Sequence, residues 1–222
     1  MGGLPEYKAK LEALSDLVAS GKLGAASTWN APHMVAISFG QHLYYPFLSP
    51  VKDAVIPLKM RPLAIGEPSE VTFVQDVMAF YDSVAGKEKL RGRSLYLLRN
   101  ADNRAKGLGF TLAGNFYPDF LLWLVDDKTG RQWLSFIDPK GIRNMNISDP
   151  KFGLYREIKQ IESQLEDRTI SLSAFILSLT TFNDLLNVMG STTKSDLEDR
   201  NVLFLDDGGP AYLEKLLDKA LA

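Results

Sequence analysis

Three charged residues, Asp119, Asp138 and Lys140, adjoin the two most apolar segments of the chain. Asp119 lies near the start of the apolar run 116–125, and Asp138 and Lys140 follow the run 132–137. We expect these runs to pair as an antiparallel hairpin, in which the start of one strand lies beside the end of the next. Asp138 and Lys140 are two residues apart, so both side chains point to one face of the strand. Two carboxylates and one ammonium group are therefore expected to converge at one end of the hairpin.

These groups have the chemistry needed for magnesium-assisted cleavage of a phosphodiester bond. Mg²⁺ prefers oxygen ligands and keeps several waters, which two carboxylates at a strand end can accommodate. A bound metal polarises the scissile phosphate, and a neighbouring lysine can orient or deprotonate the attacking water. The alternative is a surface ion pair worth less than about 1 kcal/mol. A charge beside such apolar strands is, however, costly unless it serves a purpose.

The elements around the hairpin follow an α/β order. We predict a helix over 68–86, which Ser69 can cap, and then a strand over 94–99. The turn 126–130 joins the two strands of the hairpin. A helix over 149–165 and a strand over 171–179 follow. The order helix, strand, strand, strand, helix, strand predicts an α/β fold with a mixed β-sheet flanked by helices.

The N-terminal part of the chain carries weaker signals. Helical spacing of leucines predicts a helix over 6–20, and short strands are expected at 33–39 and 54–56. Aromatic and turn-prone residues between 44 and 50 are expected to connect these strands. No chemistry is evident in this part of the sequence.

The C-terminal part is predicted to be mainly helical. Short helices are expected around 184–189 and 212–221, with the apolar residues 202–205 between them. We therefore divide the chain into an N-terminal extension (1–66), a core (67–179) and a C-terminal helical extension packed on that core (180–222).

Two short motifs resemble those of the PD-(D/E)xK nuclease superfamily, whose signature is Pro-Asp on the second core strand and Asp/Glu-x-Lys on the third. Here they read Pro118-Asp119 and Asp138-Pro139-Lys140. The surrounding residues look most like the C-terminal nuclease domain of type III restriction-like DEAD/DEAH helicases. This resemblance covers residues 70–179, about half of the chain, and implies a restriction-endonuclease-like core.

The resemblance also implies roles for particular residues. Asp119 and Asp138 would bind Mg²⁺, with Mn²⁺ able to substitute, and Lys140 would assist the nucleophile. The first core helix of this superfamily often supplies a further glutamate, and Glu70 is the candidate by position, with Asp76 and Glu67 as the next choices. The alternative for Glu70 is a carboxylate that complements the dipole at a helix start.

The function implied is that of a metal-dependent DNA endonuclease domain, the nuclease module of a restriction or phage-defence helicase-nuclease. Its expected partners are DNA and a helicase or translocase module in the same or a partner polypeptide. A double-strand cutter with one site per chain often needs two copies, so a homodimer is an open alternative. Two other readings stay open: a catalytically inactive nuclease-fold module that binds nucleic acid or protein, and a structural ion-pair cluster in an unrelated α/β domain.

A basic stretch between residues 87 and 106 could contact the phosphate backbone of DNA. The residues assigned to this role are Arg91, Arg93, Arg99, Arg104 and Lys106. A solvated loop and strand edge would account for the same charges equally well.

Composition excludes several other classes of function. The 25 basic and 27 acidic residues give a net charge of −2, which argues against binding nucleic acid through bulk charge alone. With no cysteine there is no thiol nucleophile or cysteine-ligated metal site, and with only 2 histidines a histidine-rich zinc site is not expected. The N-terminus lacks the apolar core of a signal peptide, and no stretch is apolar for long enough to span a membrane. A cytoplasmic location without membrane partners is expected.

Overall fold

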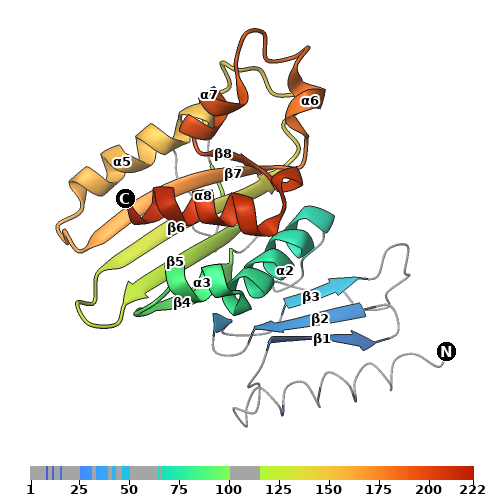
Figure 1. Ribbon diagram of the computed structural model, residues 1–222, viewed down its shortest axis with the longest axis vertical. Coiled ribbons are helices and arrows are strands. Elements are labelled where there is room, and N and C mark those ends of the chain that lie inside the picture. Colours follow the sequence, from blue (N-terminus) through green and yellow to red (C-terminus); the bar gives the residue numbers. More distant parts are fainter. Residues whose placement is uncertain are drawn as a thin grey trace. The chain divides into compact units, whose positions relative to one another are not determined.

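The computed structural model describes Ala9, Glu12, Asp16, Ile65 and the ranges 26–31, 34–39, 42–43, 47–50, 67–100 and 116–222 (Figure 1). The chain forms two compact units, Met1–Val71 and Thr72–Ala222.

The N-terminal unit contains a three-stranded antiparallel sheet. Its strands are β1 (Ala26–Ala31), β2 (Met34–Phe39) and β3 (Phe47–Pro50), in the order β1-β2-β3. The strand expected at 33–39 is confirmed as β2. The expectation that 44–50 only connects strands is wrong, because the backbone from Phe47 to Pro50 pairs with β2. Pro50 is tolerated there because it closes the strand at a sheet edge.

Two other predictions for the N-terminal unit have different outcomes. Ala9, Glu12 and Asp16 are helical, in agreement with the helix expected over 6–20. The strand expected at 54–56 lies outside the described residues.

The second unit is built on a five-stranded mixed sheet, which confirms the predicted α/β class. Its strands are β4 (Arg93–Arg99), β5 (Phe120–Asp126), β6 (Gln132–Lys140), β7 (Ile170–Ser178) and β8 (Val202–Phe204). They lie in the order β4-β5-β6-β7-β8. The pairs β4–β5 and β5–β6 are antiparallel, whereas β6–β7 and β7–β8 are parallel.

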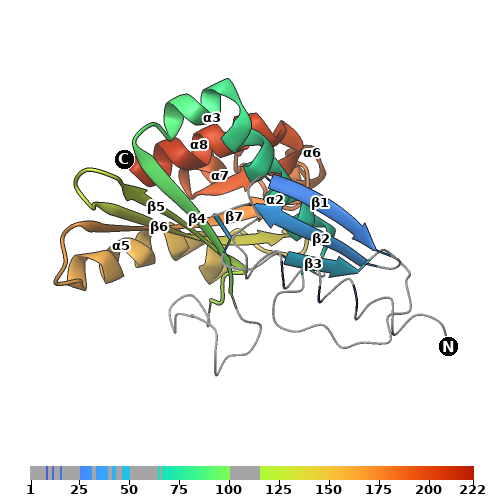
Figure 2. The same ribbon diagram turned by 90° about the horizontal axis from the view of Figure 1, so that it is seen from below.

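Helices cover both faces of this sheet (Figures 1 and 2). One face is covered by α5 (Leu154–Gln164), which follows the short 3-10 helix η2 (Pro150–Gly153). The other face is covered by α3 (Val84–Lys89) and α8 (Gly209–Leu221). Leu154 and Ile158 of α5 share a buried cluster with Phe136 of β6, so even-numbered residues of β6 point toward α5.

The helix predicted over 68–86 is interrupted. It forms as α2 (Pro68–Asp82), and a new helix, α3, starts after Ser83. The Ser83 hydroxyl donates to the Phe80 carbonyl at 2.6 Å and accepts from the Gly86 N–H at 3.0 Å, so this one side chain satisfies both helix ends. The prediction missed the break because serine caps leave no gap in the apolar pattern.

The C-terminal residues belong to the same compact unit as the core sheet. They contain α6 (Phe182–Leu185), α7 (Lys194–Asp199), β8, the 3-10 helix η3 (Leu205–Asp207) and α8. The apolar segment 202–205 provides the fifth strand, β8, whose three residues are all buried. The helix expected at 184–189 is only partly confirmed, because α6 spans Phe182–Leu185 and residues 186–189 form turns and a bend; α7 is an additional helix.

Candidate functional site

The predicted site residues Asp119, Asp138 and Lys140 lie at one end of the β5–β6 hairpin. Phe120 faces Ile137 in the antiparallel register, so Asp119 and Asp138 occupy the next position on each strand. Pro118 precedes Asp119 and Pro139 follows Asp138, and neither proline has an N–H to donate. The hydrogen-bond ladder therefore ends at the aspartates, where the two strands can separate.

The backbone at Asp119 departs from the regular ladder. Its N–H donates to the Ile137 carbonyl at 2.9 Å, although Ile137 already faces Phe120. Two residues on one strand thus oppose a single residue on the other, which is the pattern of a β-bulge. Asn100 supports this turn of the chain, since its side-chain amide donates to the Pro118 carbonyl at 2.8 Å. Bulges of this kind redirect a side chain and occur often beside active sites.

Asp138 is a buried carboxylate, with only 4% of the residue exposed. It projects to the same face of β6 as Phe136, toward α5. Its carboxylate forms an ion pair with the ammonium group of Lys140, two residues along the strand. Burial of a charge is tolerated only with such compensation. The two-residue spacing therefore brings Asp138 and Lys140 together, as expected from the sequence.

Asp119 is more accessible and is compensated by Arg99. Its side chain is 29% exposed, whereas that of Arg99 is 6% exposed. One guanidinium nitrogen of Arg99 donates to both the backbone carbonyl (2.7 Å) and the carboxylate (3.1 Å) of Asp119. The guanidinium also lies 5.1 Å from the centre of the Phe120 ring. Arg99 thus holds the bulged residue in place from the end of β4.

Lys151 is a site residue that the sequence did not reveal. It lies in η2, and its ammonium group interacts with the Lys140 ammonium group and the Asp138 carboxylate. Burial lowers the pKa of Lys151 below its usual range, and the neighbouring positive charge of Lys140 lowers it further. Its position could have been anticipated, because the crossover that follows β6 must begin at the same end of the sheet.

Three acidic residues are proposed as further ligands from the first core helix, and the structure gives each a different environment. They are Glu70, Glu67 and Asp76. Glu70 is buried in the first turn of α2, on the N-terminal side of the boundary between the two units, and its role stays a prediction. Glu67 is exposed just before α2. Asp76 accepts a hydrogen bond from the Tyr212 hydroxyl at 2.9 Å, and burial raises the pKa of its carboxyl although that bond opposes the change.

A metal site at this end of the sheet would rest on two carboxylates. Within the ranges that the structure describes, no three carboxylate or imidazole groups come close enough together to hold one ion. Asp119 and Asp138 are the acidic pair available at the strand ends, and solvent or a substrate would have to supply further oxygen ligands.

Of the arginines predicted to contact DNA, Arg99 lies at Asp119, whereas Arg93 and Arg91 lie at the far end of β4. Arg93 begins β4 and faces Asp126 at the opposite end of the hairpin, so six residue steps, or roughly 20 Å, separate its backbone from that of Arg99. Its guanidinium lies 5.3 Å from the Trp133 ring. Arg91 is exposed near Arg93. Arg104 and Lys106 lie outside the described residues.

Comparisons of the chain with protein-family models, curated proteins and solved structures give no match in any of the three. Among the described residues, no helix has the length and apolar character needed to cross a bilayer.

Proposed function

We propose that the unit from Thr72 to Ala222 has a restriction-endonuclease-like core and is a metal-dependent nuclease that hydrolyses phosphodiester bonds in DNA. The observation that supports this proposal is that Asp119 and the Asp138–Lys140 ion pair come from neighbouring strand positions where the β5–β6 ladder ends. The order of elements from α2 to β7 adds support, because it follows the order on which the resemblance to the nuclease superfamily rests. Asp119 and Asp138 would then be the metal-binding residues.

The side chains at this end of the sheet fit a hard divalent cation such as Mg²⁺ or Mn²⁺. Both aspartates offer oxygen atoms, and they come from neighbouring positions of adjacent strands. Asp119 is partly exposed, which leaves room for water and for a phosphate oxygen. When bound, the metal would polarise the scissile phosphate and lower the pKa of a coordinated water.

Lys140 and Lys151 would have different roles in the reaction. Lys140 is held against Asp138 and can orient an attacking water or offset the charge that develops on phosphate. The lowered pKa of Lys151 leaves more of its amine neutral at a given pH than in an ordinary lysine, so more of it is available to act as a base. Asp138 would thus both bind the metal and hold the Lys140 ammonium group in place through their ion pair.

Cleavage of plasmid DNA with Mg²⁺ or Mn²⁺ tests the proposal. Asp119→Asn, Asp138→Asn and Lys140→Ala are each expected to lower the cleavage rate by at least about a hundredfold, since each removes a charge from the reacting centre. Asp127→Asn and Lys128→Ala are matched controls, because both residues are exposed at the other end of the same hairpin. Unchanged cleavage in all three site variants, with folding verified by circular dichroism, would exclude the proposed site.

A second candidate is a nuclease-fold module that binds nucleic acid or protein without hydrolysing it. The observation that favours it is the compensation of each aspartate by a cation of the chain, Arg99 for Asp119 and Lys140 for Asp138. Thermal unfolding separates the two candidates. A metal site that binds the folded protein raises the melting temperature with Mn²⁺ concentration, and Asp138→Asn abolishes that rise, whereas the inactive module shows no rise in either protein.

The partners follow from the same proposal. The net charge of −2 gives the chain little general attraction for DNA, so a helicase or translocase module, in the same or a partner polypeptide, would supply effective concentration. Addition of such a module in trans or as a fusion is expected to increase the cleavage rate without changing the dependence on Asp138.

A further inference from the structure

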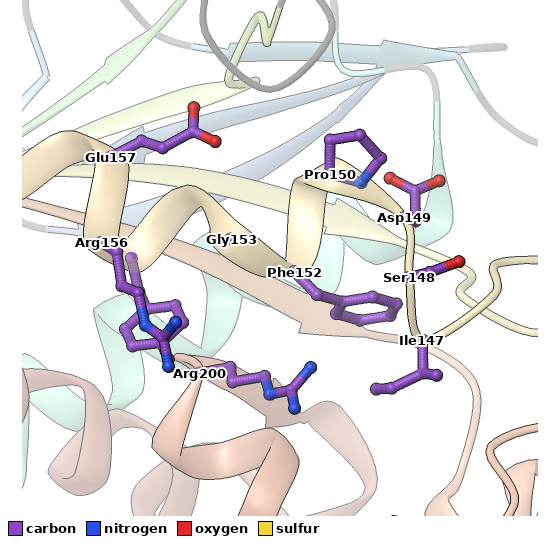
Figure 3. Close-up of a pocket in the computed structure, with 10 residues that line it drawn as sticks. Ile147, Ser148, Asp149, Pro150, Phe152, Gly153, Arg156, Glu157 and Arg200 are labelled. Atoms are coloured by element: carbon purple, nitrogen blue, oxygen red, sulfur yellow. The ribbon is translucent and has the colours of Figure 1, made fainter.

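A second group of charged side chains surrounds a pocket beside the start of α5. The pocket has a volume of about 290 Å³ and lies between η2, the first turns of α5 and the residue that follows α7 (Figure 3). Arg156 of α5 and Arg200 after α7 both line it. We call it the arginine pocket.

Among the described residues, neither guanidinium group in the arginine pocket is held in a close ion pair, although the charge of Arg200 does interact with that of Asp196. Neither Arg156 nor Arg200 forms an ion pair with any residue in the described part of the chain. Arg156 lies 5.1 Å from the centre of the Tyr155 ring, a contact that fixes the guanidinium without neutralising it.

The charges are separated within the pocket. Figure 3 shows both arginine side chains on one side of the pocket, with Asp149 and Glu157 on the other. The Asp149 carboxylate is occupied at the helix start, where it accepts from the Lys151 N–H at 2.9 Å. Two guanidinium groups that line one recess, neither in a close ion pair, match the charge of a phosphate group and can donate to its oxygens.

The arginine pocket lies on the same side of the sheet as Asp138. Its lining residue Phe152 belongs to a buried cluster with Ile176 and Val202. Ile176 faces Asp138 across β6 and β7, and Val202 faces Ile176 across β7 and β8. Two interstrand spacings, or roughly 10 Å, therefore separate the strand positions of Asp138 and Val202, and Arg200 comes just before Val202. A polymer with a phosphate on every nucleotide can occupy both places at once.

We propose that Arg156 and Arg200 bind a backbone phosphate of the nucleic acid, next to the phosphate that Asp119 and Asp138 act on. This inference rests on the proposed function and adds a second anchoring point for its substrate. A free phosphate ion or a mononucleotide has the same chemistry, and the test below distinguishes it from a nucleic-acid backbone.

Binding of a short fluorescent DNA duplex, measured by anisotropy with Ca²⁺ in place of Mg²⁺, tests the arginine pocket. The double variant Arg156→Ala/Arg200→Ala is expected to bind about tenfold more weakly. The slope of log affinity against log salt should also become shallower by about 0.9, the value for one lost phosphate contact. The control double variant Lys159→Ala/Arg168→Ala removes the same charge from two exposed residues and is expected to change neither quantity. Melting temperatures of both variants verify that they are folded.

Three results of the DNA-binding measurement would overturn the inference: no DNA binding by the wild type, equal losses in both double variants, or unchanged binding in the arginine variant. A second experiment measures the melting temperatures of the wild type and the arginine variant with inorganic phosphate at constant ionic strength. If phosphate stabilises the wild type but not the arginine variant while DNA affinity is the same in both, the ligand is a free phosphate and the inference fails. Cleavage assays keep the two proposals separate. If the wild type cleaves DNA with metal and the arginine variant binds DNA normally, only the phosphate-binding role of the arginine pocket is rejected. If the arginine variant loses DNA binding but the wild type does not cleave DNA, only the proposed hydrolysis is rejected.

Discussion

Arg99 links the stability of the candidate site to its charge. Its guanidinium bonds to the backbone and to the carboxylate of Asp119, and it packs over the ring of Phe120. The bulge at Asp119 has lost one regular ladder contact because Pro118 and Pro139 cannot donate. The hydrogen bonds of Arg99 to Asp119 replace part of those lost from the ladder. The main role that we assign to Arg99 is therefore to stabilise the strand end, not to contact DNA.

Replacement of Arg99 is expected to destabilise the fold. Arg99→Ala removes a donor from the Asp119 carbonyl, which keeps the Asn100 N–H, and removes the cation paired with the partly buried Asp119 carboxylate, so it should lower the free energy of unfolding by about 2 kcal/mol. Urea unfolding monitored by tryptophan fluorescence measures the change. Arg91→Ala is the matched control, because Arg91 is exposed and its loss should cost less than about 0.5 kcal/mol. Similar losses in the two variants would contradict the role assigned to Arg99.

At the scale of elements, the β5–β6 hairpin could be predicted from the sequence, whereas the short elements β8 and α7 were not predicted. The runs 116–125 and 132–137 are so apolar that only a buried strand pair accommodates them, which placed Asp119, Asp138 and Lys140 at one end. β8 has three residues, too few for a periodic pattern. α7 is polar, yet its capping box of Thr193 and Asp196 was a signal in the sequence. Lys151 escaped because its place depends on the crossover after β6.

The break between α2 and α3 makes a specific demand on Gly86. A Cβ at this position would overlap the carbonyl oxygen of Phe80, which belongs to the backbone of α2 and cannot move aside cheaply. Gly86→Ala is therefore expected to lower the free energy of unfolding by about 2 to 3 kcal/mol, in spite of the better helix propensity of alanine.

Gly153→Ala is the matched control for that substitution. The new Cβ would meet the Glu157 carboxylate at 3.6 Å, an ordinary contact, and the φ of Gly153 is −94°. This variant should be neutral or gain about 0.5 kcal/mol in the same unfolding experiment. A loss at Gly153 equal to that at Gly86 would show that helix packing at Phe80 is not the cause.

At the scale of the whole Thr72–Ala222 unit, a group of ion pairs joins the C-terminal elements to one another. Asp207 of η3 pairs with Lys194 of α7 and, at 3.2 Å, with Lys215 of α8, which also contacts Glu198 at 2.7 Å. These contacts hold α7 and α8 around β8, and β8 completes the sheet beside β7. The acid stability of the unit should therefore depend in part on this group.

The effect of Asp207→Asn on the free energy of unfolding, measured as a function of pH, tests the contribution of these ion pairs. Burial by itself would raise the pKa of Asp207, but the ammonium groups of Lys194 and Lys215 outweigh it and hold the pKa below the ordinary value of 3.8. A carboxylate with a lowered pKa in the folded state contributes stability above its unfolded pKa, and that contribution disappears as pH falls through the folded pKa. Asp207→Asn should thus cost about 1 kcal/mol at pH 7, and this difference should shrink toward zero as the pH falls below the ordinary value. Urea unfolding across the acid range measures the difference, with exposed Asp206→Asn as the control that should stay close to the wild type. A cost for Asp207→Asn that is constant with pH would mean that packing, and not charge, makes Asp207 matter.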